Sequence, residues 1–182
     1  MHKYGSVVTD LLNDPDLDRV IEEVSNLPPK KVINALLPKI LSIEEGIKRR
    51  AITVAGVLIA HLADNDMEAA RIFMRRLIWQ LTDESGGCPF GAPELMAEAM
   101  ANNRSLADEY ANILISYIIP DGNYLEFEPL QLGAVWGIGR LAEVYPDLVR
   151  DSAPYLNQLL TSHDLHIREN SRQALERIEQ VS

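Results

Sequence analysis

Two carboxylate-rich segments contain the residues most able to do chemistry. Acidic and aromatic residues lie together in both, namely Asp83, Glu84, Phe90 and Glu94, then Asp121, Tyr124, Glu126, Phe127 and Glu128. Carboxylates steer the encounter with a basic partner, and aromatic side chains supply binding free energy when the partner covers them. Carboxylate oxygens also suit a hard cation, although no EF-hand spacing is present. Three interpretations stay open: a ridge that binds a basic protein segment, structured loops without a ligand, and a metal site.

The other reactive residues do not form a recognisable catalytic or metal-binding pattern. Cys88, the single cysteine, has no histidine near it in the sequence, and nucleophilic catalysis needs a base that raises the thiolate fraction. His163 and His166 are three residues apart but lie on either side of an expected turn, so they lack metal-ligand spacing. We therefore assign no residue to catalysis, to a metal or to a cofactor, and the metal site at the carboxylates stays only an alternative.

Two glycines of one segment could be mistaken for a dinucleotide-binding fingerprint. That fingerprint requires a strand before Gly137 and Gly139 and a helix that begins at them, whereas residues 128–145 have the periodicity of one helix. We expect these glycines to let a neighbouring helix approach closely. For Arg140, in the same segment, we weigh an ion pair with a neighbouring carboxylate against contact with a partner.

Composition and charge exclude several classes of protein. The 182 residues have a formal net charge of -10, and 47% of them are hydrophobic, which is ordinary for an acidic globular protein. Residues 92–182 hold 14 acidic and 6 basic residues, which would repel nucleic acid. The one basic cluster, Lys48-Arg49-Arg50 with Arg71, Arg75 and Arg76, favours a solvated helix face over the alternative of an anion-binding patch. No apolar run reaches the ~18 residues of a membrane span and no signal peptide is visible, so we expect a cytoplasmic protein.

Helical periodicity runs through most of the chain, with apolar residues at steps of three and four. The expected helices span about 5–12, 16–25, 29–41, 45–63, 67–81, 92–102, 105–119, 128–145, 147–161 and 165–180. Comparable apolar positions recur at spacings of 40, 38 and 41 residues, at Leu37, Leu77, Ile115 and Leu156. A period of about 40 residues with two helices per unit is typical of HEAT and armadillo solenoids.

Each helical hairpin would expose an apolar face that it cannot bury alone, so neighbouring hairpins must stack. We therefore predict an all-α superhelix, a HEAT/armadillo-like solenoid, as a single domain over residues 1–182. Its expected parts are an N-terminal cap, 1–27, and four repeats at about 28–64, 66–103, 105–145 and 147–181. The two carboxylate-rich loops should then lie on one edge in adjacent layers. Trp79 and Trp136 are expected to pack in the core or between repeats.

The last expected hairpin resembles a HEAT-like repeat of the PBS-lyase type. Its turn aspartate, Asp164, is followed by the pair Ile167-Arg168 and then by Ala174-Leu175, as in that pattern. The chain from Pro28 onward is also similar to small bacterial HEAT-repeat proteins. That similarity lies in Glu84-Ser85-Gly86-Gly87, in Gly91-Ala92-Pro93-Glu94 and in residues 133–141. The resemblance implies a solenoid fold, and some PBS-lyase-type HEAT proteins act on or assist tetrapyrrole attachment.

We predict a non-enzymatic module that binds another protein, such as one with a basic segment, through its concave face or its long-loop edge. Neither nucleic acid nor a membrane is an expected partner. The residues predicted to contact the partner are Glu84, Phe90, Glu94, Tyr124, Glu126, Trp136 and Arg140. The alternative, which comes from the resemblance, is a tetrapyrrole or cofactor lyase-like activity or a related chaperone activity.

Overall fold

The computed structural model describes residues 2–82 and 89–180, and all regular elements in these two ranges are helices. The N-terminal half contains α1 (His2–Leu12), α2 (Leu17–Ser25), α3 (Pro29–Leu36), the 3-10 helix η1 (Leu37–Leu41), α4 (Glu45–Asn65) and α5 (Met67–Thr82). The C-terminal half contains α6 (Ala92–Ala101), α7 (Arg104–Ser116), α8 (Glu128–Val144), α9 (Pro146–Val149), η2 (Arg150–Ser152), α10 (Ala153–Leu159) and α11 (Leu165–Glu179).

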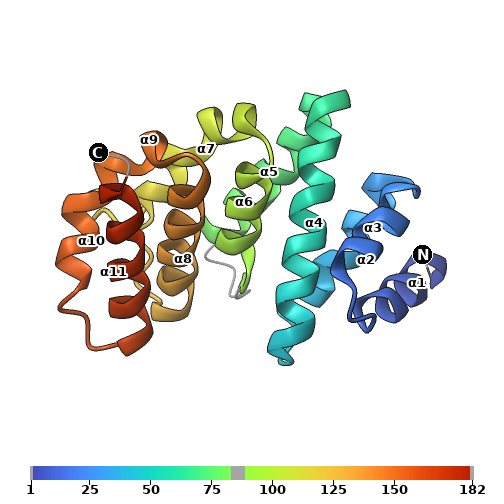
Figure 1. The fold of residues 1–182 in the computed structure, drawn as a ribbon, viewed down its shortest axis with the longest axis horizontal. Coiled ribbons are helices and arrows are strands. Elements are labelled where there is room, and N and C mark those ends of the chain that lie inside the picture. Colours follow the sequence, from blue (N-terminus) through green and yellow to red (C-terminus); the bar gives the residue numbers. More distant parts are fainter. Residues whose placement is uncertain (1, 83–88, 181–182) are drawn as a thin grey trace.

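The helices from α3 onward are arranged as stacked hairpins in two layers (Figure 1). One layer consists of α4, α6, α8 and α11, which contact one another in that order, and the other contains α5, α7 and α10. Buried apolar side chains form one cluster that extends from Val8 in α1 to Ile178 in α11. The predicted all-α superhelix is therefore confirmed, while its division into a single domain with a cap stays a prediction.

Asn103 begins α7 and also ties that helix to the preceding hairpin. Its Oδ1 accepts a hydrogen bond from the Leu106 N–H at 3.0 Å, which satisfies a donor of the first helical turn. Its Nδ2 donates to Oδ1 of Asp64, near the end of α4, at 2.8 Å. One buried amide therefore fixes both the start of a helix and its position against α4.

The turn before α11 is held by two residues of the predicted HEAT-like pattern. Oδ1 of Asp164 accepts a hydrogen bond from the Ile167 N–H at 3.0 Å and so caps the helix. Nη1 of Arg168 donates to the carbonyl oxygens of Ser162 and His163, at 2.7 and 3.1 Å. Both side chains hold the turn through backbone contacts, which explains why a short aspartate and an arginine suit these positions.

Two predicted helices are interrupted, and this part of the prediction is wrong. Residues 29–41 divide into α3 and η1, and residues 147–161 divide into α9, η2 and α10. Pro38 lies in the first turn of η1 and Pro154 in the first turn of α10. Proline lacks an N–H group and its ring clashes with the carbonyl four residues earlier, which kinks or breaks an α-helix, and here the α-helix is interrupted at both positions.

Glycines allow close approach between the helices of the first layer, as predicted for α8. A Cβ at Gly137 would lie 2.8 Å from the Cβ of Ala97 in α6. A Cβ at Gly56 in α4 would lie 2.5 Å from the Cβ of Glu98, also in α6. Because real Cβ contacts are longer than this, α4, α6 and α8 can pack this closely only with glycine at these positions.

The two tryptophans have different environments. Trp79 was expected to be packed, but 63% of its surface is exposed on α5, seven residues after the exposed Ile72. The buried face of α5 is instead formed by residues such as Phe73 and Leu77. Trp136 is half-buried and packs against the core from α8. The packing prediction is therefore wrong for Trp79 and right for Trp136.

Candidate partner-binding groove

A pocket of about 660 Å³ spans the layer of α4, α6, α8 and α11. It lies over the N-terminal parts of all four helices, which begin at one edge of the molecule (Figure 1). Its lining includes Lys48, Ile52, Glu94, Trp136, His166 and Asn170. Two residues of the predicted partner-binding set, Glu94 and Trp136, therefore meet in one pocket although they are far apart in the sequence.

Glu94 and Lys48 form an ion pair in the wall of this pocket. Nζ of Lys48 lies 3.7 Å from Oε1 of Glu94, and their side chains are 20% and 17% exposed, respectively. Burial raises the pKa of the Glu94 carboxyl above its ordinary value, and the positive charge of Lys48 opposes that shift. Gly133 of α8 leaves space for this carboxylate, because a Cβ there would lie 2.5 Å from Oε2 of Glu94. Glu94 is thus a buried acid at the junction of three helices.

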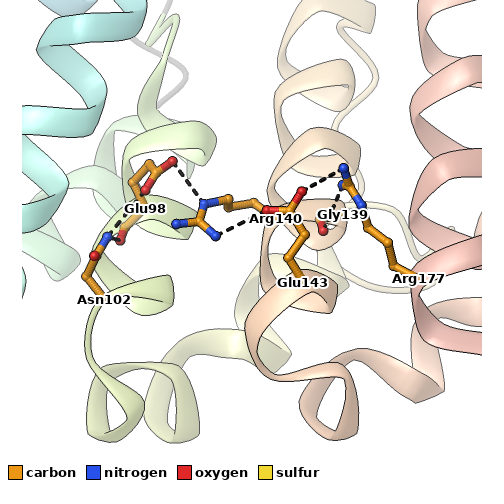
Figure 2. A network of polar contacts seen from close by, with 6 residues as sticks. All are labelled: Glu98, Asn102, Gly139, Arg140, Glu143 and Arg177. Atoms are coloured by element: carbon orange, nitrogen blue, oxygen red, sulfur yellow. Dashed lines mark hydrogen bonds and ion pairs between the residues drawn. The ribbon is translucent and has the colours of Figure 1, made fainter. Parts of the chain in front are cut away.

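Arg140 lies one helical turn beyond Trp136 and belongs to a polar network that crosses the same layer (Figure 2). Its Nε donates to Oε1 of Glu98 in α6 at 3.1 Å, and its Nη1 donates to Oε2 of Glu143 at 3.2 Å. Arg177 of α11 continues the network, with Nη2 at 2.6 Å from Oε1 of Glu143. The structural alternative for Arg140, an ion pair with a carboxylate of the neighbouring repeat, is therefore present in the structure.

Phe90 and Phe127, which end the two long loops just before α6 and α8, meet on the edge where the helices of the pocket begin. The ring centroids of Phe90 and Phe127 are 5.9 Å apart, with their planes tilted by 58°. This contact confirms that the described ends of the two loops are neighbours. Phe90, Tyr124 and Phe127 are 37%, 40% and 49% exposed. Further exposed apolar side chains before or at the starts of these helices are Leu41, Ile43 and Leu165.

The carboxylates of the two loops do not form one cluster. Asp121, Glu126 and Glu128 are exposed on the edge, whereas Glu94 is only 17% exposed in the pocket. Within residues 2–82 and 89–180, no group of three or more His, Cys, Asp or Glu side chains is arranged to hold a metal ion. Glu84, together with Asp83 and Cys88, lies outside the described residues.

Several pocket residues were missed by the sequence analysis. Lys48 and Arg49 belong to the basic cluster that was interpreted as a solvated face. Arg49 is exposed, whereas most of the Lys48 side chain is covered. His166 and Asn170 gave no signal, because their position beside α4 depends on how the hairpins stack. Among the described residues, no helix is both long and apolar enough to cross a membrane.

Residues 128–178 match the family model described as a HEAT-like repeat. The chain is 37% identical over 87 residues to an uncharacterized protein of Archaeoglobus fulgidus. The match covers 48% of this chain and 42% of that relative, so less than half of the relative's length is represented.

Solved structures with similar folds include a designed armadillo repeat protein and the armadillo repeats only protein from Plasmodium falciparum. The first is 20% identical with a TM-score of 0.49, and the match covers 94% of this chain and 80% of that one. The second is 15% identical with a TM-score of 0.48, and the match covers 96% and 78%. The stacked hairpins and the HEAT-like repeat in residues 128–178 thus define an all-α superhelix of the HEAT/armadillo type.

Proposed function

We propose that this chain is a non-catalytic, cytoplasmic module that binds another protein through the groove and the adjoining loop edge. The observation that carries the proposal is the exposed pair of Phe90 and Phe127 beside a pocket built from four helices. Large aromatic side chains contribute much of the binding free energy of protein interfaces when a partner covers them. A row of such residues next to a concave pocket is therefore well suited to hold a protein segment.

The charges on the loop edge favour a partner segment that carries basic residues. Asp121, Glu126 and Glu128 are exposed close to Tyr124 and Phe127 in the sequence. The chain as a whole has a formal net charge of -10. Long-range attraction would therefore raise the association rate of a basic segment, and the aromatic contacts would slow its release.

The tetrapyrrole or cofactor activity implied by the family resemblance is not favoured. None of the matched proteins described above carries such an activity in its name. Catalysis by groups in the pocket would need a nucleophile, a base and an orienting group that converge on one point. The described pocket instead presents a paired acid and base, apolar side chains and an indole.

Capture of partners from a lysate of cells that naturally produce the chain tests this function. The variant Phe90→Ala with Phe127→Ala removes the aromatic pair, and we expect it to lose most of each specifically captured protein. Trp79→Ala is the control, because it removes an exposed aromatic side chain of α5 that does not line the pocket. Far-UV circular dichroism establishes that each variant is folded. Identical capture by wild type and the double variant would contradict the proposal.

A further inference from the structure

Lys48 is a mostly buried cation whose contacts to carboxylates are long. Its Nζ lies 3.7 Å from Oε1 of Glu94 and 3.9 Å from Oε2 of Glu45, and only 20% of its side chain is exposed. Hydrogen bonds between an ammonium and a carboxylate normally measure about 2.7–2.9 Å, so both contacts are ion pairs that are longer than such a bond. An acceptor oxygen that enters the pocket has room to form a shorter, charge-assisted hydrogen bond with this ammonium.

The charges and donors around Lys48 favour an anion over a cation. Arg49 adds a second cation, with its Nε 3.4 Å from Oε1 of Glu45, and Thr53 adds a hydroxyl to the lining. Both carboxylates of the pocket are already paired with these cations, and burial favours the neutral form of Glu94. The pocket also borders the first turns of α4, α6 and α11, whose N-terminal ends carry partial positive charge.

The rest of the lining is suited to an apolar group. Ile52 of α4 and Leu132 of α8 line the pocket, and so does the half-buried Trp136. A volume of about 660 Å³ lies within the usual range of pockets for small ligands. A well-matched ligand group would therefore carry a carboxylate and an apolar side chain on the same small unit.

We propose that the pocket binds the C-terminal residue of the partner chain, with the carboxylate on Lys48 and an apolar side chain against Ile52 and Trp136. A C-terminal residue carries both groups on one α-carbon, whereas an internal acidic residue needs a second residue to supply the apolar contact. This inference rests on the proposed function. Basic residues that precede the C-terminus would lie towards Glu126 and Glu128 on the loop edge.

Three small probes test the chemistry of the pocket in the absence of a partner protein. N-acetyl-phenylalanine carries a terminal carboxylate, N-acetyl-phenylalaninamide lacks it, and N-acetyl-aspartyl-phenylalaninamide carries only a side-chain carboxylate. Binding is followed by the indole N–H signal of Trp136 in NMR spectra. We expect the first probe to bind about tenfold to a hundredfold more tightly than the second, because one charge-assisted hydrogen bond is lost.

Variants of Lys48 assign the effect to this residue. Lys48→Met should lower the affinity for N-acetyl-phenylalanine to that of the amide, and Lys48→Arg should restore most of it. Lys30→Met is the matched control, because Lys30 pairs with Asp66 near the start of α5, away from the pocket. Equal affinities for acid and amide, tight binding of the aspartyl probe, or no saturable binding of any probe would each overturn the proposal.

The two proposals fail in distinguishable ways. If captured partners depend on Phe90 and Phe127 but bind the Lys48→Met variant as well as wild type, the C-terminal assignment alone is wrong. If N-acetyl-phenylalanine binds through Lys48 but no protein is captured, the carboxylate pocket stands and the protein-binding function fails.

Discussion

Tyr117 buries a polar group that has no hydrogen-bond partner among the described residues. Its side chain is 1% exposed, and its hydroxyl oxygen makes no hydrogen bond within that part of the chain. Burial alone raises the pKa of this hydroxyl to about 12. The residue closes α7 and packs with the apolar core, so its ring contributes to stability while its hydroxyl detracts from it.

We therefore expect Tyr117→Phe to raise the free energy of unfolding by roughly 1 kcal/mol, because it removes an unsatisfied buried hydroxyl and keeps the ring. Urea unfolding followed by circular dichroism measures this change. Tyr124→Phe is the control, since Tyr124 is 40% exposed and its hydroxyl can reach water. A clear loss of stability in Tyr117→Phe would show that the hydroxyl has a favourable contact after all.

At the scale of elements, the spacing between helices of the first layer is set by small residues. Gly56 of α4 contacts Glu98 of α6 so closely that a Cβ would also lie 3.0 Å from the Glu98 carbonyl carbon. A backbone atom cannot move aside as the end of a flexible side chain can. Gly46, near the start of α4, has nothing within 4 Å of its expected Cβ position.

The two glycines of α4 should therefore respond to alanine with opposite signs. Gly56→Ala should lower the free energy of unfolding by about 1–3 kcal/mol, because α4 and α6 must separate. Gly46→Ala should raise it by about 0.5 kcal/mol, because alanine favours the helix and no contact is disturbed. Chemical unfolding of both variants measures these changes. A Gly56→Ala variant with the wild-type free energy of unfolding would mean that α4 and α6 can separate at no cost in stability.

At the scale of the whole molecule, ion pairs join neighbouring hairpins along the superhelix. They connect residues about one repeat apart in the sequence and occur in both layers. The pairs are Arg71 with Glu109, Arg104 with Asp147, Glu98 with Arg140, and Glu143 with Arg177. Most are partly exposed and contribute little stability each. The pair of Glu98 and Arg140 differs, because only 9% of the Glu98 side chain is exposed.

Removal of Arg140 should therefore uncouple α6 from α8. We expect Arg140→Met to lower the free energy of unfolding by about 3 kcal/mol, because Glu98 is left as a buried charge without its main partner. Arg140→Met combined with Glu98→Gln should recover most of this loss. A double-mutant cycle from urea unfolding curves gives the coupling. Arg104→Met should cost less than about 1 kcal/mol, and equal losses in both single variants would contradict this account.

Much of the architecture could be predicted because it depends on local chemistry. Apolar residues at steps of three and four predict the helices, and the recurrence of about 40 residues predicts their stacking. Stacked repeats also predict that a neighbouring helix approaches Gly137 closely and that Phe90 and Phe127 lie on the same edge. The interruptions of the helices at Pro38 and Pro154 also have a local cause. They could have been predicted from the two prolines, because proline disfavours the interior of an α-helix. The exposure of Trp79 was missed because an apolar type was assumed to be buried.

The sequence by itself determined the helical hairpins, their repeat and the acidic loop edge, since these depend on side-chain periodicity and on neighbours in the chain. Only the tertiary structure decided that Lys48, Glu94, Trp136 and His166, one from each of four helices, line the same pocket. The reason is geometric. The superhelix brings these residues together through packing distances and crossing angles between hairpins, and those quantities depend on contacts such as Gly56 with Glu98 that no single segment contains.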